Sequence, residues 1–145
     1  MWFSGQVEHV NDPAVVRRLL TSPTTWAVVG LSTNRRRAAY GVAEYLASSL
    51  GMTIVPIHPA AESVHGQRGY AHLADVPGGV AVVDVFVNSA RAGAVVDEAI
   101  AVGARAVWLQ RGVIDESAAG RARAAGLDVV MDACPAIEGP RLGVG

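Results

Sequence analysis

The sequence has a single cysteine, Cys134, among its 145 residues. One cysteine excludes an intramolecular disulfide and the paired-cysteine patterns of structural zinc sites. The histidines, at positions 9, 58, 65 and 72, also lack the spacing of metal ligands, so we expect no metal site.

Charge and long apolar runs are also scarce. Charged residues make up 17% of the chain and the formal net charge is −1, so no overall basic field favours binding to nucleic acid or to an anionic membrane. No apolar run reaches the roughly 18 residues that a membrane span needs. The first residues, MWFSGQVEHV, lack the basic and apolar regions of a signal peptide. We therefore expect a cytoplasmic protein.

Two common nucleotide motifs are missing. Only Gly30 of a G-x-G-x-x-G fingerprint is present, and no G-K-[ST] of a P-loop follows it. NAD-binding enzymes usually place an acid at the end of the second strand for the ribose hydroxyls. Here the predicted strand over 53–58 ends at His58-Pro59, and the nearest acid, Glu62, lies beyond the turn. These absences disfavour NAD, whereas a phosphorylated adenosine would suit the nearby arginines and His58.

The stretch 26–40, WAVVGLSTNRRRAAY, holds the most informative pattern. A short apolar strand is followed by Gly30, by the polar loop Ser32-Thr33-Asn34 and by the arginines at 35–37, where a helix is predicted to begin. Glycine lets the backbone approach a ligand, a helix N-terminus offers unpaired N–H groups, and arginine binds phosphate through a planar fork of donors. Alternatively, the arginines form a solvated first turn paired with nearby acids. Because basic charge is unfavourable at a helix N-terminus, we favour a bound anion.

Apolar periodicity and turn residues predict an alternating α/β chain. After a first helix that begins at Asn11-Asp12-Pro13, we expect strands near 26–30, 53–58, 80–87, 104–109 and 127–131, with helices near 37–50, 89–102 and 115–125. Residues 132–145 are irregular or a short terminal helix. Pro56 indicates an edge strand or an irregular segment, and 66–70 is expected to bring Tyr70 back over the strand ends.

This alternation predicts one Rossmann-like domain over 1–145. Its core covers about 20–142, and 1–22 forms an N-terminal helix and extension. The sheet is expected to be parallel and doubly wound, with about five strands and right-handed crossovers. Asp84 is the one polar residue inside the third strand, and we expect either a buried, hydrogen-bonded acid or a functional group.

Ligands of such sheets bind beyond the carboxyl ends of the strands, near the switch point of the strand order. This rule gathers five segments around one crevice: 30–37, 56–59, 86–89, 110–112 and 132–135. The candidate binding residues in these segments are Gly30, Ser32, Thr33, Asn34, Arg37, His58, Pro59, Phe86, Gln110, Gly112 and Cys134.

Several segments together resemble the small stand-alone coenzyme A-binding proteins, which are similar to the N-terminal nucleotide-binding domain of the succinyl-coenzyme A synthetase α chain. They are VVGLS at 28–32, IVPIHP at 54–59, VVDVF at 82–86, EAIAVGARAVWLQRGV at 98–113 and AAGLDVVMDACPAIEGPRL at 124–142. The resemblance covers about 20–142 and implies a Rossmann-like fold that binds coenzyme A.

By position, Gly30, Ser32 and Arg37 match the phosphate loop of these proteins. The chain departs from their pattern at three places: His58-Pro59 replaces a common Asn-Pro, Val87 replaces a common arginine after the third strand, and Ala133 replaces a common arginine before the cysteine. Cys134 itself has two readings. Free cysteine is commonly a small buried residue, whereas its place near the strand ends would let its thiol form a mixed disulfide with coenzyme A.

The resemblance implies a non-catalytic protein that binds coenzyme A or an acyl-coenzyme A. Two alternatives stay open: an NADP-type dinucleotide-binding protein, and an acyl- or phosphoryl-transfer enzyme subunit that needs a partner. In the synthetase, the histidine that carries phosphate and the partner subunit lie outside the region that this chain resembles. A protein partner or a homodimer is left open.

Overall fold

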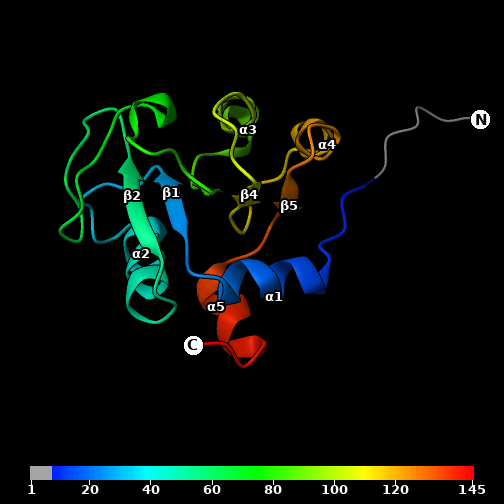
Figure 1. The fold of residues 1–145 in the computed structure, drawn as a ribbon, viewed down its shortest axis with the longest axis horizontal. Helices are drawn as coiled ribbons and strands as arrows, with labels where there is room; N and C mark the ends of the chain where they lie inside the picture. Colours follow the sequence, from blue (N-terminus) through cyan, green and yellow to red (C-terminus); the bar gives the residue numbers. More distant parts are fainter. Residues whose placement is uncertain (1–7) are drawn as a thin grey trace, which may run out of the picture.

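Five parallel strands form the central sheet of the computed structural model, which describes residues 8–145 (Figure 1). The strands lie in the order β2-β1-β3-β4-β5, one of the two common doubly wound orders, and the order reverses between β1 and β3. The strands are β1 (Thr25–Val29), β2 (Thr53–Ile57), β3 (Val82–Val85), β4 (Ala106–Leu109) and β5 (Asp128–Val130). The predicted parallel, doubly wound sheet is confirmed.

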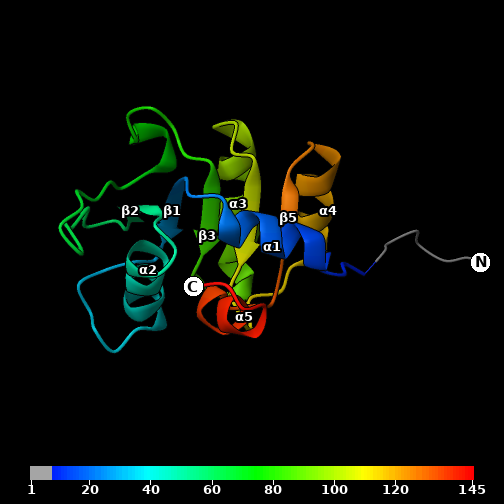
Figure 2. The same ribbon diagram turned by 60° about the horizontal axis from the view of Figure 1, so that its bottom comes forward.

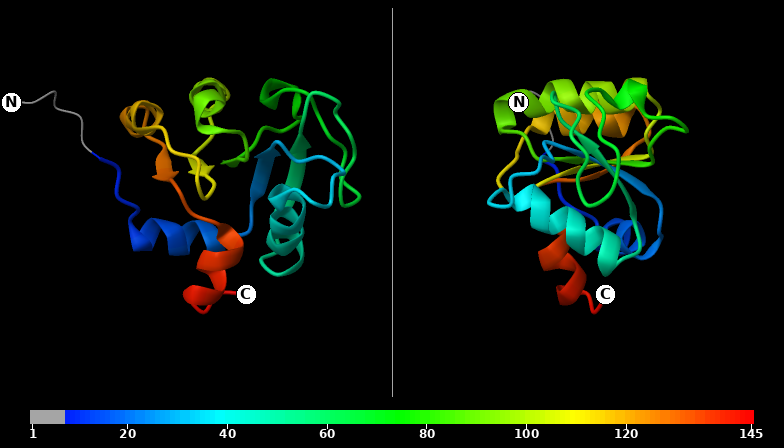
Figure 3. Two further views of the ribbon diagram at one scale, coloured as in Figure 1. Left: turned by 180° about the vertical axis from the view of Figure 1, so that it is seen from behind. Right: turned by 90° about the vertical axis from the view of Figure 1, so that its left-hand side faces the viewer.

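Helices cover both faces of the sheet, as the side view of Figure 3 shows. The helices are α1 (Pro13–Thr21), α2 (Ala38–Ser48), α3 (Ser89–Ala101), α4 (Glu116–Ala124) and α5 (Pro135–Arg141), with a short 3-10 helix, η1 (Leu73–Asp75). One apolar cluster lies under α1, α2 and α5, and the other lies under α3, α4 and η1. Figure 2 shows α1 crossing the sheet beside α5.

Side-chain caps explain why three helices begin where the sequence predicts. Asp12 accepts a hydrogen bond from the amide of Ala14, Asn88 from that of Arg91, and Asp115 from that of Ala118. Each cap satisfies an N–H group that has no partner inside its helix. The starts of α2 and α5 lack such a cap, because their N-cap residues, Arg37 and Cys134, make no side-chain hydrogen bond to the helix.

The core differs in character between the two faces. On the α1, α2 and α5 face, Trp26 of β1 and Trp108 of β4 are fully buried, and their ring centroids lie 5.7 Å apart. On the other face, α4 contacts the core through Ala118, Ala119 and Ala122, which let the helix backbone lie close to the sheet. The tryptophan pair thus belongs to one layer and the alanine contact of α4 to the other.

The edge position predicted from Pro56 is confirmed, because β2 lies at one end of the sheet. Tyr70 returns to this edge as expected. Its amide donates to the carbonyl of Pro56 at 2.9 Å, and its own carbonyl accepts from the amide of His58 at 3.1 Å. The returning segment thus satisfies backbone groups that an uncovered edge strand would leave open.

Several predicted boundaries are wrong by one or two residues, and η1 was not predicted. The third strand covers 82–85 instead of 80–87, because burial extends the apolar run beyond the stretch that the neighbouring strands can pair. Residues 135–141 form a short helix that begins at a proline. In the described part of the chain, no helix is long and apolar enough to span a membrane.

Candidate functional site

Gly30 directly follows β1 at the point where the strand order reverses. Its φ is +101°, and a Cβ atom at this position would lie 2.8 Å from the carbonyl oxygen of Phe86, which follows β3. The amide of Gly30 donates to the carbonyl of Ile57 at 2.8 Å, which holds the turn against β2 as well. Only glycine combines this φ with such a close approach. The ends of β1, β2 and β3 are therefore fixed together here.

The loop after Gly30 is ordered by its own polar groups. Ser32 Oγ accepts from the amide of Asn34 at 3.2 Å, and Asn34 Oδ1 accepts from the amide of Arg36 at 3.0 Å. Thr33 Oγ1 donates to Glu62 at 3.4 Å. The loop thus reaches α2 in a defined shape, and Glu62, the acid nearest to β2, faces this loop.

The N-terminus of α2 has no side-chain cap and no acid in its first turn. Its unpaired N–H groups carry the positive end of the helix dipole, which favours an anion. Ala38 and Ala39 of this first turn line a cleft together with Arg37. The start of α2 is therefore open to a negatively charged ligand.

This cleft, of about 580 Å³, opens at the switch point between the starts of α2 and α3. Five predicted site residues line it: Gly30, Arg37, His58, Pro59 and Phe86. Its other lining residues are Val29, Ala38, Ala39, Ile57, Ala71, His72, Val87, Asn88, Arg91, Val95 and Glu98. The cleft includes residues from three of the five predicted segments, 30–37, 56–59 and 86–89, and it extends along α3 further than the sequence indicated.

The charged groups of the cleft are mainly basic. Arg37 and Arg91 line it, with Glu98 as its one acid. Neither arginine side chain has an ion pair or hydrogen bond with another residue within 8–145. His58 Nδ1 accepts from the amide of Ala60 at 3.2 Å, so a neutral ring carries its proton on Nε2. The cleft can therefore present donors to an anionic ligand.

The three consecutive arginines have separate surroundings. The guanidinium carbon of Arg35 lies 5.8 Å from the ring centroid of Tyr40, a cation–π distance. The amide of Arg36 belongs to the turn that Asn34 closes. Only Arg37 lines the cleft. One arginine of the triplet is thus placed to meet a ligand there.

The remaining predicted site residues do not line this cleft. Ser32, Thr33 and Asn34 stand beside it in the loop. Gln110 is 4% exposed, and the amide of Gly112 donates a hydrogen bond to Asp132 Oδ1 at 2.7 Å. Cys134, half-buried, is the N-cap residue of α5. The last three follow β4 and β5, which lie one and two strands away from β3.

Sequence reasoning missed three polar cleft residues: His72, Arg91 and Glu98. Asn88 also lines the cleft and lies in the predicted segment 86–89, although it was expected only as a helix cap. A signal for Arg91 was present. It is a basic residue in the first turn of α3, where the dipole disfavours positive charge, and the same reasoning drew attention to the arginines at 35–37.

Asp84 is fully buried, and neither carboxylate oxygen has a hydrogen-bond partner within residues 8–145. Asp84 is thus buried as one of the two predictions expected, but the hydrogen bonds that this prediction included are absent from the described residues. Asp84 shares a side of β3 with Val82, which contacts the tryptophan cluster, since alternate strand residues point to the same face. Burial raises the pKa of Asp84 well above its ordinary value of 3.8, because a charge is costly in this apolar setting.

Burial also raises the pKa of the Cys134 thiol above its ordinary value of 9.0, although the amides of Ala136 and Ile137 act against this shift. Thiols react as thiolates, so the side chain is a weak nucleophile at neutral pH. Within residues 8–145, no group of three or more His, Cys, Asp or Glu side chains is arranged to hold a metal ion.

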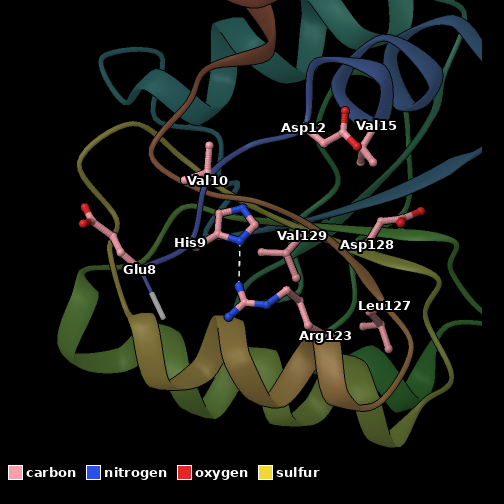
Figure 4. Close-up of a pocket in the computed structure, with 9 residues that line it drawn as sticks. All are labelled: Glu8, His9, Val10, Asp12, Val15, Arg123, Leu127, Asp128 and Val129. Atoms are coloured by element: carbon pink, nitrogen blue, oxygen red, sulfur yellow. Dashed lines mark hydrogen bonds between the residues drawn. The ribbon is translucent and has the colours of Figure 1, made fainter. Parts of the chain in front are cut away.

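A second hollow, of about 370 Å³, lies at the β5 edge of the sheet, away from the cleft (Figure 4). His9 Nδ1 contacts a guanidinium nitrogen of Arg123 at 2.6 Å near its centre. Beside it, Asn11 exchanges two hydrogen bonds with the backbone of Met131, of 2.9 and 2.8 Å. These contacts attach the segment before α1 to the end of β5.

Comparison with known proteins adds three findings. A family model described as a CoA binding domain matches residues 24–140, from β1 to α5. The uncharacterized protein YneT of Bacillus subtilis (strain 168) is 28% identical over 121 residues, which cover 83% of this chain and 89% of YneT. A hypothetical protein from Pyrococcus horikoshii OT3 is 32% identical with a TM-score of 0.85, over 98% of this chain and 99% of that one.

A larger enzyme shares the fold. The dinucleotide forming acetyl-coenzyme A synthetase 1 of Ca. Korarchaeum cryptofilum, solved with phosphate and ADP, matches with a TM-score of 0.68 at 24% identity. The match covers 81% of this chain and 27% of the synthetase chain, so this chain spans about a quarter of that enzyme.

Replacing Gly30 tests the close approach to Phe86. We expect Gly30→Ala to lower the unfolding free energy by about 2–4 kcal/mol, since backbone strain adds to overpacking. Gly103→Ala is the matched control, because Gly103 has φ +78° and no atom within 4 Å of an added Cβ. It should lose only about 1 kcal/mol in urea unfolding. Equal losses in the two variants would contradict the proposed constraint.

Replacing Asp84 tests its buried, protonated state. An acid whose pKa is raised in the folded protein binds a proton on folding. Stability therefore falls by about 1.4 kcal/mol per pH unit between the ordinary and the raised pKa. Asp84→Asn should remove this slope, so the variant gains stability relative to wild type as the pH rises above about 4. Urea unfolding from pH 4 to 8 measures the difference.

The exposed residue Asp75 provides the control for this measurement, because it has no hydrogen bond from its side chain within residues 8–145. Asp75→Asn should follow the wild-type pH dependence. Parallel curves for wild type and Asp84→Asn would show that Asp84 is ionised in the folded protein.

Proposed function

The chain belongs to the CoA binding domain family, and on that premise we propose that it binds coenzyme A or an acyl-coenzyme A without catalysing a reaction. The observation that carries this proposal is the cleft at the switch point. The uncapped start of α2, Gly30 and Arg37 all face it. This combination suits the pyrophosphate of the coenzyme.

The rest of the coenzyme is assigned by the chemistry of the neighbouring residues. Ile57, Pro59 and Ala71 give the cleft apolar lining for the adenosine. Ser32, Thr33 and Asn34 stand beside the start of α2 and complete the phosphate loop. We assign the pantetheine arm to the strand ends at Gln110, Gly112 and Cys134, which share the carboxyl edge of the sheet with the cleft. Here the thiol of coenzyme A would meet Cys134.

NAD fits the same cleft less well. Its adenosine ribose usually contacts an acid at the end of the second strand. The nearest acid here, Glu62, accepts a hydrogen bond from Thr33 instead. An NADP-type ligand remains the competing dinucleotide, because its extra phosphate would suit the arginines.

A second candidate function is that of an enzyme subunit for acyl or phosphoryl transfer. The shared fold with an acetyl-coenzyme A synthetase favours it. The proposed site, however, offers no activated nucleophile, since burial raises the pKa of its one thiol. A partner would have to supply the reacting groups. We therefore prefer the binding function.

Thermal unfolding with coenzyme A, acetyl-coenzyme A, NAD, NADP and ATP tests the ligand. A ligand at 100 times its dissociation constant adds about 2.7 kcal/mol to stability. For a domain of this size, the midpoint should rise by roughly 5–10 °C with coenzyme A. Arg37→Ala should reduce this rise, whereas Arg105→Ala, an exposed arginine at the opposite ends of the strands, should not. A rise with NADP but none with coenzyme A would refute the proposal.

Turnover separates the binding function from the enzymatic one. Pure protein incubated with succinate or acetate, a nucleoside triphosphate and coenzyme A should form no acyl-coenzyme A, because the site lacks a nucleophile with a lowered pKa. Chromatography of the coenzyme pool provides the readout. Steady formation of an acyl-coenzyme A that Arg37→Ala abolishes would establish an enzyme.

A further inference from the structure

Two arginines approach the cleft from opposite faces of the sheet. Arg37 precedes α2, which packs on the tryptophan face, and Arg91 lies in the first turn of α3, which packs on the other face. Both line the same cleft. The cleft therefore has one arginine from the helix on each side of the sheet.

The starts of these two helices differ in what they offer. The N-terminus of α2 is uncapped, so its N–H groups can bind an anion directly. In α3, Asn88 Oδ1 accepts from the amide of Arg91 at 3.1 Å and satisfies this part of the helix end. An anion beside α3 must therefore rely on the guanidinium group of Arg91 more than on the backbone.

The guanidinium of Arg91 is available for this role. Arg18, Arg121 and Arg141 form ion pairs with nearby acids, but Arg91 has neither an ion pair nor a side-chain hydrogen bond within residues 8–145. Glu98, two turns further along α3, lines the cleft as well and does not pair with it. An unpaired cation on the wall of a cleft favours a ligand with a negative group there.

We propose that Arg91 binds the 3′-phosphate of coenzyme A and makes the cleft selective for coenzyme A over dephospho-coenzyme A. The proposal rests on the proposed function. The adenosine of coenzyme A carries a pyrophosphate on its 5′ oxygen and a phosphate monoester on its 3′ oxygen, so one ribose presents two separate anions. The pyrophosphate binds at the start of α2, and the monoester accepts two parallel hydrogen bonds from Arg91.

Dissociation constants for coenzyme A and dephospho-coenzyme A, measured by calorimetry, test this assignment. Wild type should bind coenzyme A roughly ten- to a hundredfold more tightly than dephospho-coenzyme A. Arg91→Ala should weaken coenzyme A to the level of dephospho-coenzyme A and leave dephospho-coenzyme A unchanged. Arg91→Lys should keep part of the preference, because lysine supplies charge without the planar fork.

Two control variants separate this role from general electrostatics. Arg37→Ala should weaken both ligands by the same factor, since both carry the pyrophosphate. Arg105→Ala should match wild type for both ligands. Because Arg37, Arg91 and Arg105 are all exposed, each of these variants should retain the wild-type unfolding midpoint in the absence of ligand.

The outcomes distinguish this inference from the proposed function. Equal binding of the two coenzymes by wild type, or an unchanged preference in Arg91→Ala, would overturn the role of Arg91 while coenzyme A binding stands. No binding of either coenzyme by wild type would overturn the proposed function and this inference together. A preference for NADP over NAD that depends on Arg91, without coenzyme A binding, would assign the arginine to a 2′-phosphate and overturn both.

Discussion

The contact between Gly30 and Phe86 is the constraint on which the site depends. A side chain at position 30 would place a carbon 2.8 Å from the carbonyl oxygen of Phe86. Because glycine removes this obstacle, the chain can leave β1 toward one face of the sheet while the chain after β3 leaves toward the other. The starts of α2 and α3 are thereby separated above the sheet edge, and the cleft lies between them. The close packing of Gly30 against Phe86 therefore also determines where the cleft lies.

The face under α1, α2 and α5 shows a different compromise. Trp26 and Trp108 reach across β3 from its two neighbours, and their rings meet over the strand. The surroundings that favour two buried indoles are unfavourable for the carboxyl group of Asp84, which shares this face. The protein retains the acid at a cost in stability that grows with pH, because its neutral form is preferred. No contact in the described chain explains why an acid stands at this position.

The sequence predicts the order of the elements well, because the signals for them are local. Asp12, Asn88 and Asp115 each cap the helix that follows, and Pro56 correctly indicates an edge strand. The cleft was predicted at the carboxyl ends of the strands from the same local signals. Its extension along α3 was not predictable, because it depends on the long connection from β2 to β3, which carries only η1. For Gln110, the place after β4 suggested a ligand contact, whereas the 4% exposure of this residue depends on the packing of the whole fold and was not predictable.

The distribution of charge in the cleft distinguishes between ligands more sharply than the fold does. A doubly wound sheet accepts many nucleotides, and its switch point specifies only where a ligand binds. NAD carries its two charges in a single pyrophosphate, which the start of α2 and Arg37 can neutralise. It would leave Arg91 unpaired on the wall of the cleft and its ribose without an acid partner. Coenzyme A carries a second anion on the ribose and needs no such acid. Two features of this chain disfavour NAD: Arg91 on the wall of the cleft, and the lack of an acid at the end of β2. The same two features favour coenzyme A.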